Sequence, residues 1–390
     1  MIHGQIGTTQ LLNHDEVTVT SYDQGRSVLE DARFTARPAH ALALRERLGP
    51  PGLDTPQALL AAIFEQLLFA ETATHQCLRQ VVDGPLAKAS ARQLPFIQQV
   101  VRELVEAALR WGEIDLEAEF ARPLAIRTLA HLFGWPDEEV EVEQLAAWAA
   151  HLIDVTTGYG IGQALPVVQE MAAAFRALVA AKQAHPADDL ASAIATSPAL
   201  ADETERVLLL MTLFAAGTST SITALVNGLP LLLADPERLS ALRAELAAER
   251  KTLSHLIDEV LRLVTPTQYV RRWTTTDLRV GDTSVSAGCP VQVTLSAMNK
   301  DQECFHTPDA LDWQRPRRVE QAAFGFGAHA CPGAPLARME LRVALEALLA
   351  QPELHLVSEE MHWNNNQNQH RRQGVRVRVT RKEPTHGTAG

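Results

Sequence analysis

Apolar residues recur every three or four positions over most of the first half of the chain, which is the spacing of amphipathic helices. This pattern extends from residue 56 to about residue 192, and breaks such as Gly84-Pro85 divide it into several helices. Residues 203–233 are apolar almost throughout, apart from the small polar run 217–221. That stretch predicts a long helix that is buried on most sides.

Shorter segments with the two-residue period of β-strands lie before and after this helical part. Residues 16–22 carry β-branched side chains at alternate positions, and β-like runs return at 270–295 and 354–380. Helical spacing is also present at 236–264 and at 334–349. The pattern therefore predicts a mainly α protein with a small β region.

The composition agrees with one large core. Hydrophobic residues make up 46% of the chain and charged residues 21%, which are ordinary values for a globular protein. There is no internal repeat, and no linker separates two cores. One domain is expected over 1–382, followed by a disordered tail at 383–390.

The net charge of -12 disfavours nucleic acid as a partner, because a nucleic-acid binder needs a basic surface. The four cysteines are scattered and form no CxxC pair, so neither a disulfide framework nor a zinc site is expected. No export signal and no uncharged apolar segment of roughly 18 residues is recognised. The protein is expected to be cytoplasmic, without a membrane anchor.

One cysteine stands in an unusual segment. Cys331 lies among three glycines, Gly325, Gly327 and Gly333, directly before a predicted helix. A lone cysteine is normally a small buried apolar residue. A thiolate at a helix N-terminus, however, is stabilised by the helix dipole and is a soft ligand that suits iron. The glycines indicate that the backbone passes close to another group, so the second interpretation is favoured.

This segment reproduces the haem-binding signature of the cytochromes P-450 at five positions: Phe324, Gly327, His329, Cys331 and Gly333. The chain therefore resembles that family. The resemblance implies the family's triangular helical prism around a buried haem b. It also implies that Cys331 is the axial ligand of the haem iron, that Phe324 shields the sulfur and that His329 reaches a haem propionate.

The resemblance extends to other motifs in the family's order. Gly325 and Gly333 would let the loop pass close to the porphyrin. Glu259 and Arg262 match the ExxR helix, in which this pair forms a buried charge network with the loop ahead of the cysteine. Without that context, Glu and Arg three positions apart are usually a surface pair.

Three more positions would bind the haem propionates. His75 and Arg79 match a pair on an early helix, and Arg272 matches an arginine on a strand. Arg271 is adjacent, so the strand assignment could shift by one residue. For His75 alone, an ordinary histidine on a helix surface would be the simpler interpretation.

The dioxygen side of the haem departs from the family pattern. Residues 216–221 fall where the family has Ala-Gly-x-acid-Thr on its central helix. Ala216 would then contact the haem, Gly217 would widen the helix, and Thr220 would hydrogen-bond dioxygen, although its hydroxyl could also bond back to the preceding turn. Ser219 stands at the acidic position and cannot supply a carboxylate to the proton relay.

Ser219 leaves three reactions open: hydroxylation through a rewired relay, oxidation driven by hydrogen peroxide, and oxidative coupling. A haem protein that does not oxygenate, such as a sensor or a dehydratase, is a further alternative. Hydroxylation with dioxygen is the first expectation. A helical protein without haem would require all of these motifs to be coincidental.

By resemblance, the substrate would contact Thr212, Ala216, Gln268, Gln367 and Asn368. The last two belong to a polar hairpin tip at 363–370, which is either a solvated turn or an inward-facing patch. The inward alternative favours a polar substrate, such as a peptide, an amino-acid derivative or a polyketide, and possibly a substrate held by a carrier protein.

An electron donor is also expected, because the chain has no room for a fused flavin domain. The resemblance implies a ferredoxin or a flavodoxin with its reductase. Arg338 and Arg342, on the helix after Cys331, are candidates for the face that attracts an acidic donor.

Overall fold

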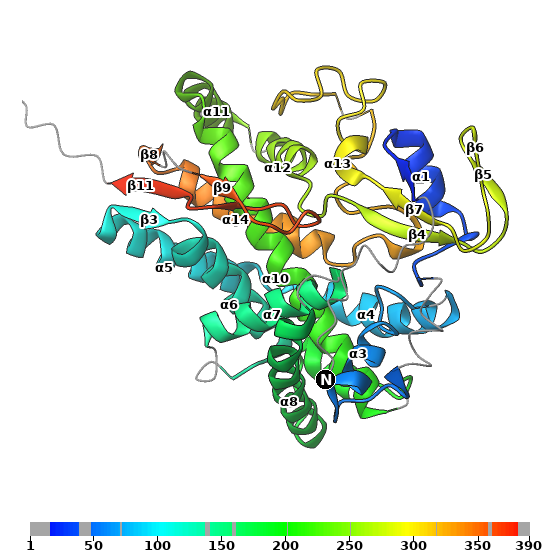
Figure 1. Ribbon diagram of the computed structural model, residues 1–390. Coiled ribbons are helices and arrows are strands. Elements are labelled where there is room, and N and C mark those ends of the chain that lie inside the picture. Colours follow the sequence, from blue (N-terminus) through cyan, green and yellow to red (C-terminus); the bar gives the residue numbers. More distant parts are fainter. Residues whose placement is uncertain are drawn as a thin grey trace, which may run out of the picture.

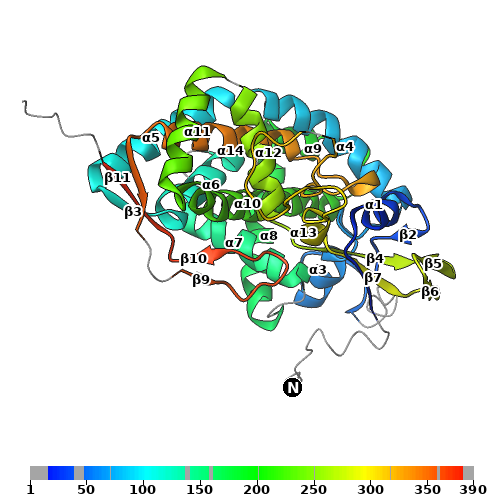
Figure 2. The same cartoon turned by 90° about the horizontal axis from the view of Figure 1, so that it is seen from above.

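The structure is a computed structural model of the whole chain (Figures 1 and 2). It describes residues 16–38, 48–70, 72–136, 141–157, 161–200, 202–249, 251–316, 318–357 and 361–380. The expected tail at 383–390 lies outside these ranges, and one domain over 1–382 stays a prediction.

Helices make up most of the described residues, as the apolar spacing predicted. They are α1 (Tyr22–Glu30), α3 (Pro56–Ile63), α4 (Thr72–Ala91), α5 (Leu94–Trp111), α6 (Arg122–Phe133), α7 (Val142–Thr157), α8 (Ile161–Ala184), α9 (Leu190–Ala195), α10 (Glu203–Leu233), α11 (Pro236–Ala248), α12 (Lys251–Val264), α13 (Leu295–Met298) and α14 (Ala334–Leu349). A π-helical turn, η2 (Glu117–Ala121), precedes α6, and a 3-10 turn, η4 (Gly327–His329), precedes Cys331.

The strands are short and form a four-stranded sheet, a three-stranded sheet and two hairpins. They are β1 (Val17–Val19), β2 (Phe34–Thr35), β3 (Glu113–Asp115), β4 (Val270–Thr274), β5 (Leu278–Val280), β6 (Thr283–Val285), β7 (Pro290–Val293), β8 (Glu353–Leu356), β9 (His362–Trp363), β10 (Arg372–Gln373) and β11 (Arg376–Thr380). The larger sheet has the order β1-β7-β4-β2, and β4 carries Arg272 opposite Val291 of β7.

Helix α10 runs through the middle of the molecule and packs against α6, α7, α8, α12 and α14 (Figure 1). It begins at Asp202, whose side chain accepts a hydrogen bond from the amide of Glu205. The polar run 217–221 does not interrupt it, because hydroxyls such as that of Thr218 donate to a carbonyl four residues earlier. The long buried helix expected at 203–233 is confirmed.

Residues 236–264 form two helices rather than the single helix that was expected. Helix α11 ends at Glu249, whose backbone is extended with φ -141° and ψ 117°. Helix α12 then begins at Lys251 and carries Glu259 and Arg262. The break lies in a charged segment, where apolar spacing gives no signal of a helix end.

Two helices, α8 and α10, are long and apolar enough to cross a membrane, by length and composition alone. The expectation that no segment has this length was therefore wrong. Helix α10 has 61% of its most apolar window buried inside the protein, and it packs against α8. The apolar length of α10 thus reflects its place at the centre of the fold.

Candidate functional site

The loop before α14 presents Cys331 to a cavity. Its backbone amide donates a hydrogen bond of 2.9 Å to the carbonyl of Phe324, which closes the loop on itself. Gly325 and Gly327 have φ values of +65° and +71°, a region that favours glycine. A Cβ on Gly327 would also overlap the carbonyl oxygen of Leu29. The glycines are thus required by the turn and by close packing.

Burial raises the pKa of the Cys331 thiol, while the backbone amides of Gly333 and Ala334 lower it. The charges of Arg79 and Arg338 also lower this pKa. The guanidinium of Arg338 lies 4.5 Å from the centre of the Phe324 ring. Amides and cations therefore favour the thiolate at a site whose burial disfavours it.

A cavity of about 310 Å³ lies between this loop and α10. It is lined by ten of the residues that the sequence singled out: Thr212, Ala216, Gly217, Thr220, Arg272, Phe324, Gly325, His329, Cys331 and Gly333. Cys331 is an exposed residue and lines this cavity. The cysteine and the central helix thus face one common space.

Cationic and imidazole groups gather at one side of the cavity. The ring of His75 on α4 lies 3.8 Å from the ring of His329. Arg79 donates a hydrogen bond of 2.8 Å to the carbonyl of Ala330, and Arg272 is 8% exposed on β4. Arg271 instead pairs with Glu16, so Arg272 is the inward arginine.

Arg79 is paired with Asp83 at 2.9 Å, whereas the buried Arg272 beside the two imidazoles has no such acidic partner in the described part of the chain. Burial lowers the pKa of Arg272 to about 10. Burial, followed by the charge of Arg272, lowers the pKa of His329 to about 3, and burial also lowers the pKa of His75. No carboxylate pairs with Arg272 within the described ranges. A ligand with carboxylates would compensate this positive field, and the propionates of a haem fit it.

The Glu259–Arg262 pair is buried, with Arg262 1% exposed. Two hydrogen bonds of 2.8 and 2.7 Å join the two side chains, and Arg262 also donates to the carbonyl of Asn299 at 2.6 Å. The Asn299 side chain in turn accepts a hydrogen bond of 2.6 Å from the amide of Ala322. The pair therefore anchors the chain that leads into the cysteine loop.

The polar residues of α10 point in different directions. Thr220 lines the cavity, and its hydroxyl donates 2.7 Å to the carbonyl of Ala216. A Cβ on Gly217 would meet Leu129 of α6 at 3.1 Å, so this glycine allows close helix packing. Ser219 does not line the cavity. It is buried and donates a hydrogen bond to the side chain of Gln369.

Three of the expected substrate contacts, Gln268, Gln367 and Asn368, do not line this cavity. Gln268 turns away from the cavity and donates to the carbonyls of Val264 and Thr265, which lie at the end of α12. Gln367 is exposed, and Asn368 bonds to the backbone of 268–269. The hairpin tip therefore contributes no polar lining to this cavity.

Two polar residues near the site were not predicted from the sequence. Gln369, one position beyond the expected pair, is the hairpin residue that reaches α10. Glu340 lines the cavity from α14. A signal for Glu340 existed, because it interrupts the apolar face formed by Leu336, Leu341 and Ala344.

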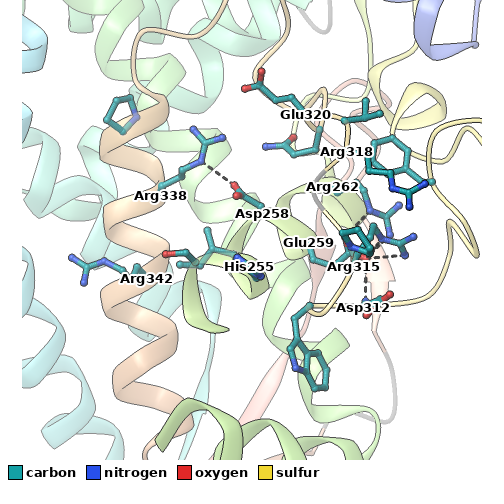
Figure 3. A pocket seen from close by; sticks show the side chains of 18 of the residues that line it. His255, Asp258, Glu259, Arg262, Asp312, Arg315, Arg318, Glu320, Arg338 and Arg342 are labelled. Carbon is teal, nitrogen blue, oxygen red and sulfur yellow. Dashed lines mark hydrogen bonds and ion pairs between the residues drawn. The ribbon is translucent and has the colours of Figure 1, made fainter. Parts of the chain in front are cut away.

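A second cavity, of about 740 Å³, lies on the other side of α14 (Figure 3). Arg338 points from α14 toward Asp258 of α12 and pairs with it at 3.0 Å, whereas Arg342 borders the cavity with its guanidinium directed to the other side of α14. The charged lining of this cavity is mixed: Asp258, Glu259, Asp312, Glu320, Arg262, Arg315, Arg318, Arg338 and Arg342. The basic patch expected here is thus interleaved with acids.

Comparisons with known proteins identify the family to which the chain belongs. A family model described as cytochrome P-450 matches residues 167–378. Cytochrome P-450 105C1 of Streptomyces sp is 35% identical over 87% of this chain and 82% of its own length. 6-Deoxyerythronolide B hydroxylase of Saccharopolyspora erythraea is 28% identical over 88% of this chain and 84% of its own length.

A solved structure shows the same architecture. P450BioI, in complex with hexadec-9Z-enoic acid ligated acyl carrier protein, matches with a TM-score of 0.82 and 27% identity over 93% of this chain and 92% of that chain. The mainly helical fold is therefore confirmed, and the family implies a haem cofactor. The chain belongs to the cytochrome P-450 family and is a cytochrome P-450 monooxygenase.

Proposed function

We propose that this protein binds haem b and hydroxylates a largely apolar, natural-product-like small molecule, with dioxygen and with electrons from a ferredoxin or flavodoxin. The observation that carries the proposal is that Cys331 and Thr220 line one cavity. Haem, when bound, supplies the iron that activates dioxygen. The protein supplies the ligand, the propionate contacts, a hydroxyl on the other side and a space for the substrate.

The roles of the side chains follow from their positions. Cys331 would ligate the iron, and Arg338 above Phe324 adds positive charge beside the sulfur. Arg272 and His329 would hold the propionates, with His75 stacked behind His329. Thr220 is placed to exchange its hydrogen bond to Ala216 for one to a ligand in the cavity.

The lining of the cavity favours an apolar substrate. Apart from the haem-facing groups, the side chains at its border are mostly aliphatic, among them Leu67, Leu68, Leu213, Val270 and Leu295. Burial of apolar substrate surface is worth about 25 cal/mol per Å². Thr212 is the polar lining residue that would orient a substrate hydroxyl or carbonyl.

The electron donor would dock over α14. Arg342 lies on this face and has no carboxylate partner in the part of the chain that is described. Arg338 borders the cavity in Figure 3 and its guanidinium lies 4.5 Å from the ring centre of Phe324, so this face lies near the cysteine loop. An acidic donor protein complements Arg318 and Arg342.

A carrier protein is a possible second partner. The support is the likeness to P450BioI, which was solved with an acyl carrier protein bearing hexadec-9Z-enoic acid. That long apolar chain is compatible with the aliphatic lining described above. Free hexadec-9Z-enoic acid is therefore a suitable probe for the cavity of this protein.

The spectrum of the reduced protein with carbon monoxide tests the ligand. Thiolate ligation gives a strongly red-shifted Soret band, and Cys331→Ala should lose that shift while haem remains bound. An unchanged band in the variant would refute the assignment. Product from the probe with dioxygen and reductant supports the hydroxylase, whereas product with hydrogen peroxide alone indicates the peroxide-driven alternative.

A further inference from the structure

A third cavity, of about 390 Å³, lies between the C-terminal turns of α10 and α12, the short helix α13 and the β9–β10 hairpin. We call it the Trp363 cavity, because the indole of that residue borders it. None of the described residues that line it also lines the cavity around Cys331. Cavities of about 300–1,000 Å³ are typical of small-molecule sites. The Trp363 cavity is therefore a separate space of suitable size for a small ligand.

An aromatic and aliphatic wall forms one part of this cavity. Trp363 is 46% exposed and is one of three large apolar side chains that are exposed in the described part of the chain. The ring of His370 is stacked on it, at 4.1 Å and an angle of 21°. Leu231 and Leu263 add aliphatic surface. An indole that stays accessible beside aliphatic groups favours a ligand with an aromatic ring.

Arg372 brings a positive charge to the same wall. It lies opposite Trp363 in the hairpin, and its guanidinium carbon is 5.0 Å from the centre of the indole ring. In the part of the chain that is described, its side chain makes one hydrogen bond, of 3.7 Å, to the Sδ atom of Met361. A thioether is a weak acceptor, so most of the donors of this guanidinium are available to a ligand.

Lys300 is a second cation at this cavity. It pairs with Asp309 at 2.9 Å, but the side chains are 47% and 79% exposed, and such surface pairs contribute little. None of the described residues that line the cavity has a carboxyl group. The chain as a whole has a net charge of -12, so a cavity with cations and no acids stands out. Its charge favours an anionic ligand, and the planar guanidinium matches a carboxylate.

Hydrogen bonds hold the walls of the cavity in place. The buried side chain of Asn227 on α10 donates to the carbonyl of His370 at 2.8 Å and accepts from the amide of Arg372 at 2.9 Å. The amide of Gln268 donates to the carbonyl of Asn368 at 2.8 Å. The hairpin is thus fixed to the helices on both sides of the cavity. A site that is already formed loses less conformational entropy when a ligand binds.

We propose that the Trp363 cavity is a second binding site, for a small molecule with an aromatic ring and a carboxylate. The carboxylate pairs with Arg372, and Lys300 adds a second positive charge. The ring packs against Trp363 and the aliphatic side chains. The proposal is independent of the hydroxylase function, because the site shares no lining residue with the cavity around Cys331.

Equilibrium dialysis of the holoenzyme with 2-naphthoate tests the charge. Arg372→Gln should weaken binding about tenfold or more, because charge-assisted hydrogen bonds are lost. This variant keeps the contact to Asn227, which uses the backbone amide. Lys300→Gln should weaken binding to a smaller extent. Arg376→Gln is the control, because that arginine lies on β11 and pairs with Glu113, and it should bind like the wild type.

Two further probes and two tryptophan variants test the ligand class. Uncharged 2-naphthalenemethanol and ring-free acetate should each bind at least about tenfold more weakly than 2-naphthoate. Trp363→Leu should weaken binding of 2-naphthoate, whereas Trp111→Leu, at an exposed tryptophan on α5, should not. Equal binding of the naphthoate and the alcohol overturns the proposal, and so does a wild type that binds no 2-naphthoate.

The Soret band of the oxidised holoenzyme reports where the probe binds, because it responds to ligands beside the iron. Binding at the Trp363 cavity should leave this band unchanged. A shift of the band that follows the dialysis curve, and that Arg372→Gln does not weaken, places the probe in the cavity around Cys331. That result overturns the proposal, while the hydroxylase function is left intact.

Discussion

The imidazole rings of His75 and His329 lie 3.8 Å apart, at an angle of 33°, although they belong to α4 and to the cysteine loop. Arg272 of β4 acts on both rings through its charge. Three elements far apart in the chain thus place positive or potentially positive groups together. An anionic ligand would stabilise this arrangement, which agrees with a haem that carries two propionates.

This cluster makes the haem-free protein sensitive to acid. The pKa of His329 is lowered from the ordinary histidine value of 6.5 to about 3 in the folded protein, so between these values the unfolded chain binds more protons. Stability should then fall by up to about 1.4 kcal/mol per pH unit below pH 6.5. Urea unfolding of the apoprotein at pH 7 and pH 5 measures the loss.

His329→Gln should remove most of this dependence, whereas the exposed His362→Gln on β9 should not. Equal pH dependence in the two variants would show that the buried ring is not the cause.

Buried Glu340 should make the stability of the folded protein fall as the pH rises, which is the opposite of the effect of His329. Burial raises the pKa of Glu340 from the ordinary glutamate value of 4.5 to about 7, so between these values the folded protein holds a proton that the unfolded chain has lost. Burial of Glu340 therefore costs nothing below pH 4.5 and up to about 3 kcal/mol above pH 7. Glu340→Gln should stabilise the protein at pH 8 and leave it unchanged at pH 4.5. A stability difference that is the same at both pH values would contradict this origin.

Arg262→Met should destabilise the protein strongly and impair haem incorporation. It leaves Glu259 with Arg315 as its remaining cationic partner and breaks the link to Asn299 and Ala322. Removal of one partner of a buried pair costs about 3–5 kcal/mol. The measurement is denaturant unfolding together with haem content.

Arg127→Met provides the control, because Arg127 pairs with Glu103 at a half-exposed position. Its cost should be below about 1 kcal/mol. Comparable losses in the two variants would argue against the anchoring role of Arg262.

Ser219→Asp should not improve coupling of electrons to product. The side chain at this position faces Gln369 rather than the cavity, so the new carboxylate would bond to the amide of Gln369. Product and peroxide yields with hexadec-9Z-enoic acid provide the measurement. A large gain in coupling would mean that a carboxylate at position 219 does reach the cavity.

Arg342→Glu should slow electron transfer from an acidic donor and reduce its dependence on salt. Reversal of one charge at a docking face acts mainly on the association rate. Stopped-flow reduction at two ionic strengths is the measurement, with turnover driven by hydrogen peroxide as the control, which should not change. Equal reduction rates in the variant and the wild type would place the donor elsewhere.

The sequence by itself determined the long central helix and the cysteine loop, because apolar periodicity and clustered glycines are local patterns. The burial of the Glu259–Arg262 pair was implied only by the family resemblance, since the spacing of the two side chains alone is typical of a surface pair. The same patterns did not locate the break at Glu249, because no apolar residue marks it.

Only the tertiary structure decided which polar groups meet at the cavity. The turn of the hairpin leaves Gln367 exposed and directs Gln369 toward α10, although residues two positions apart would share one side in a regular strand. Glu340 reaches Ser221 because α14 packs against α10, across 119 residues of chain. Contacts of this kind arise from the packing of whole elements, which single-residue patterns do not specify.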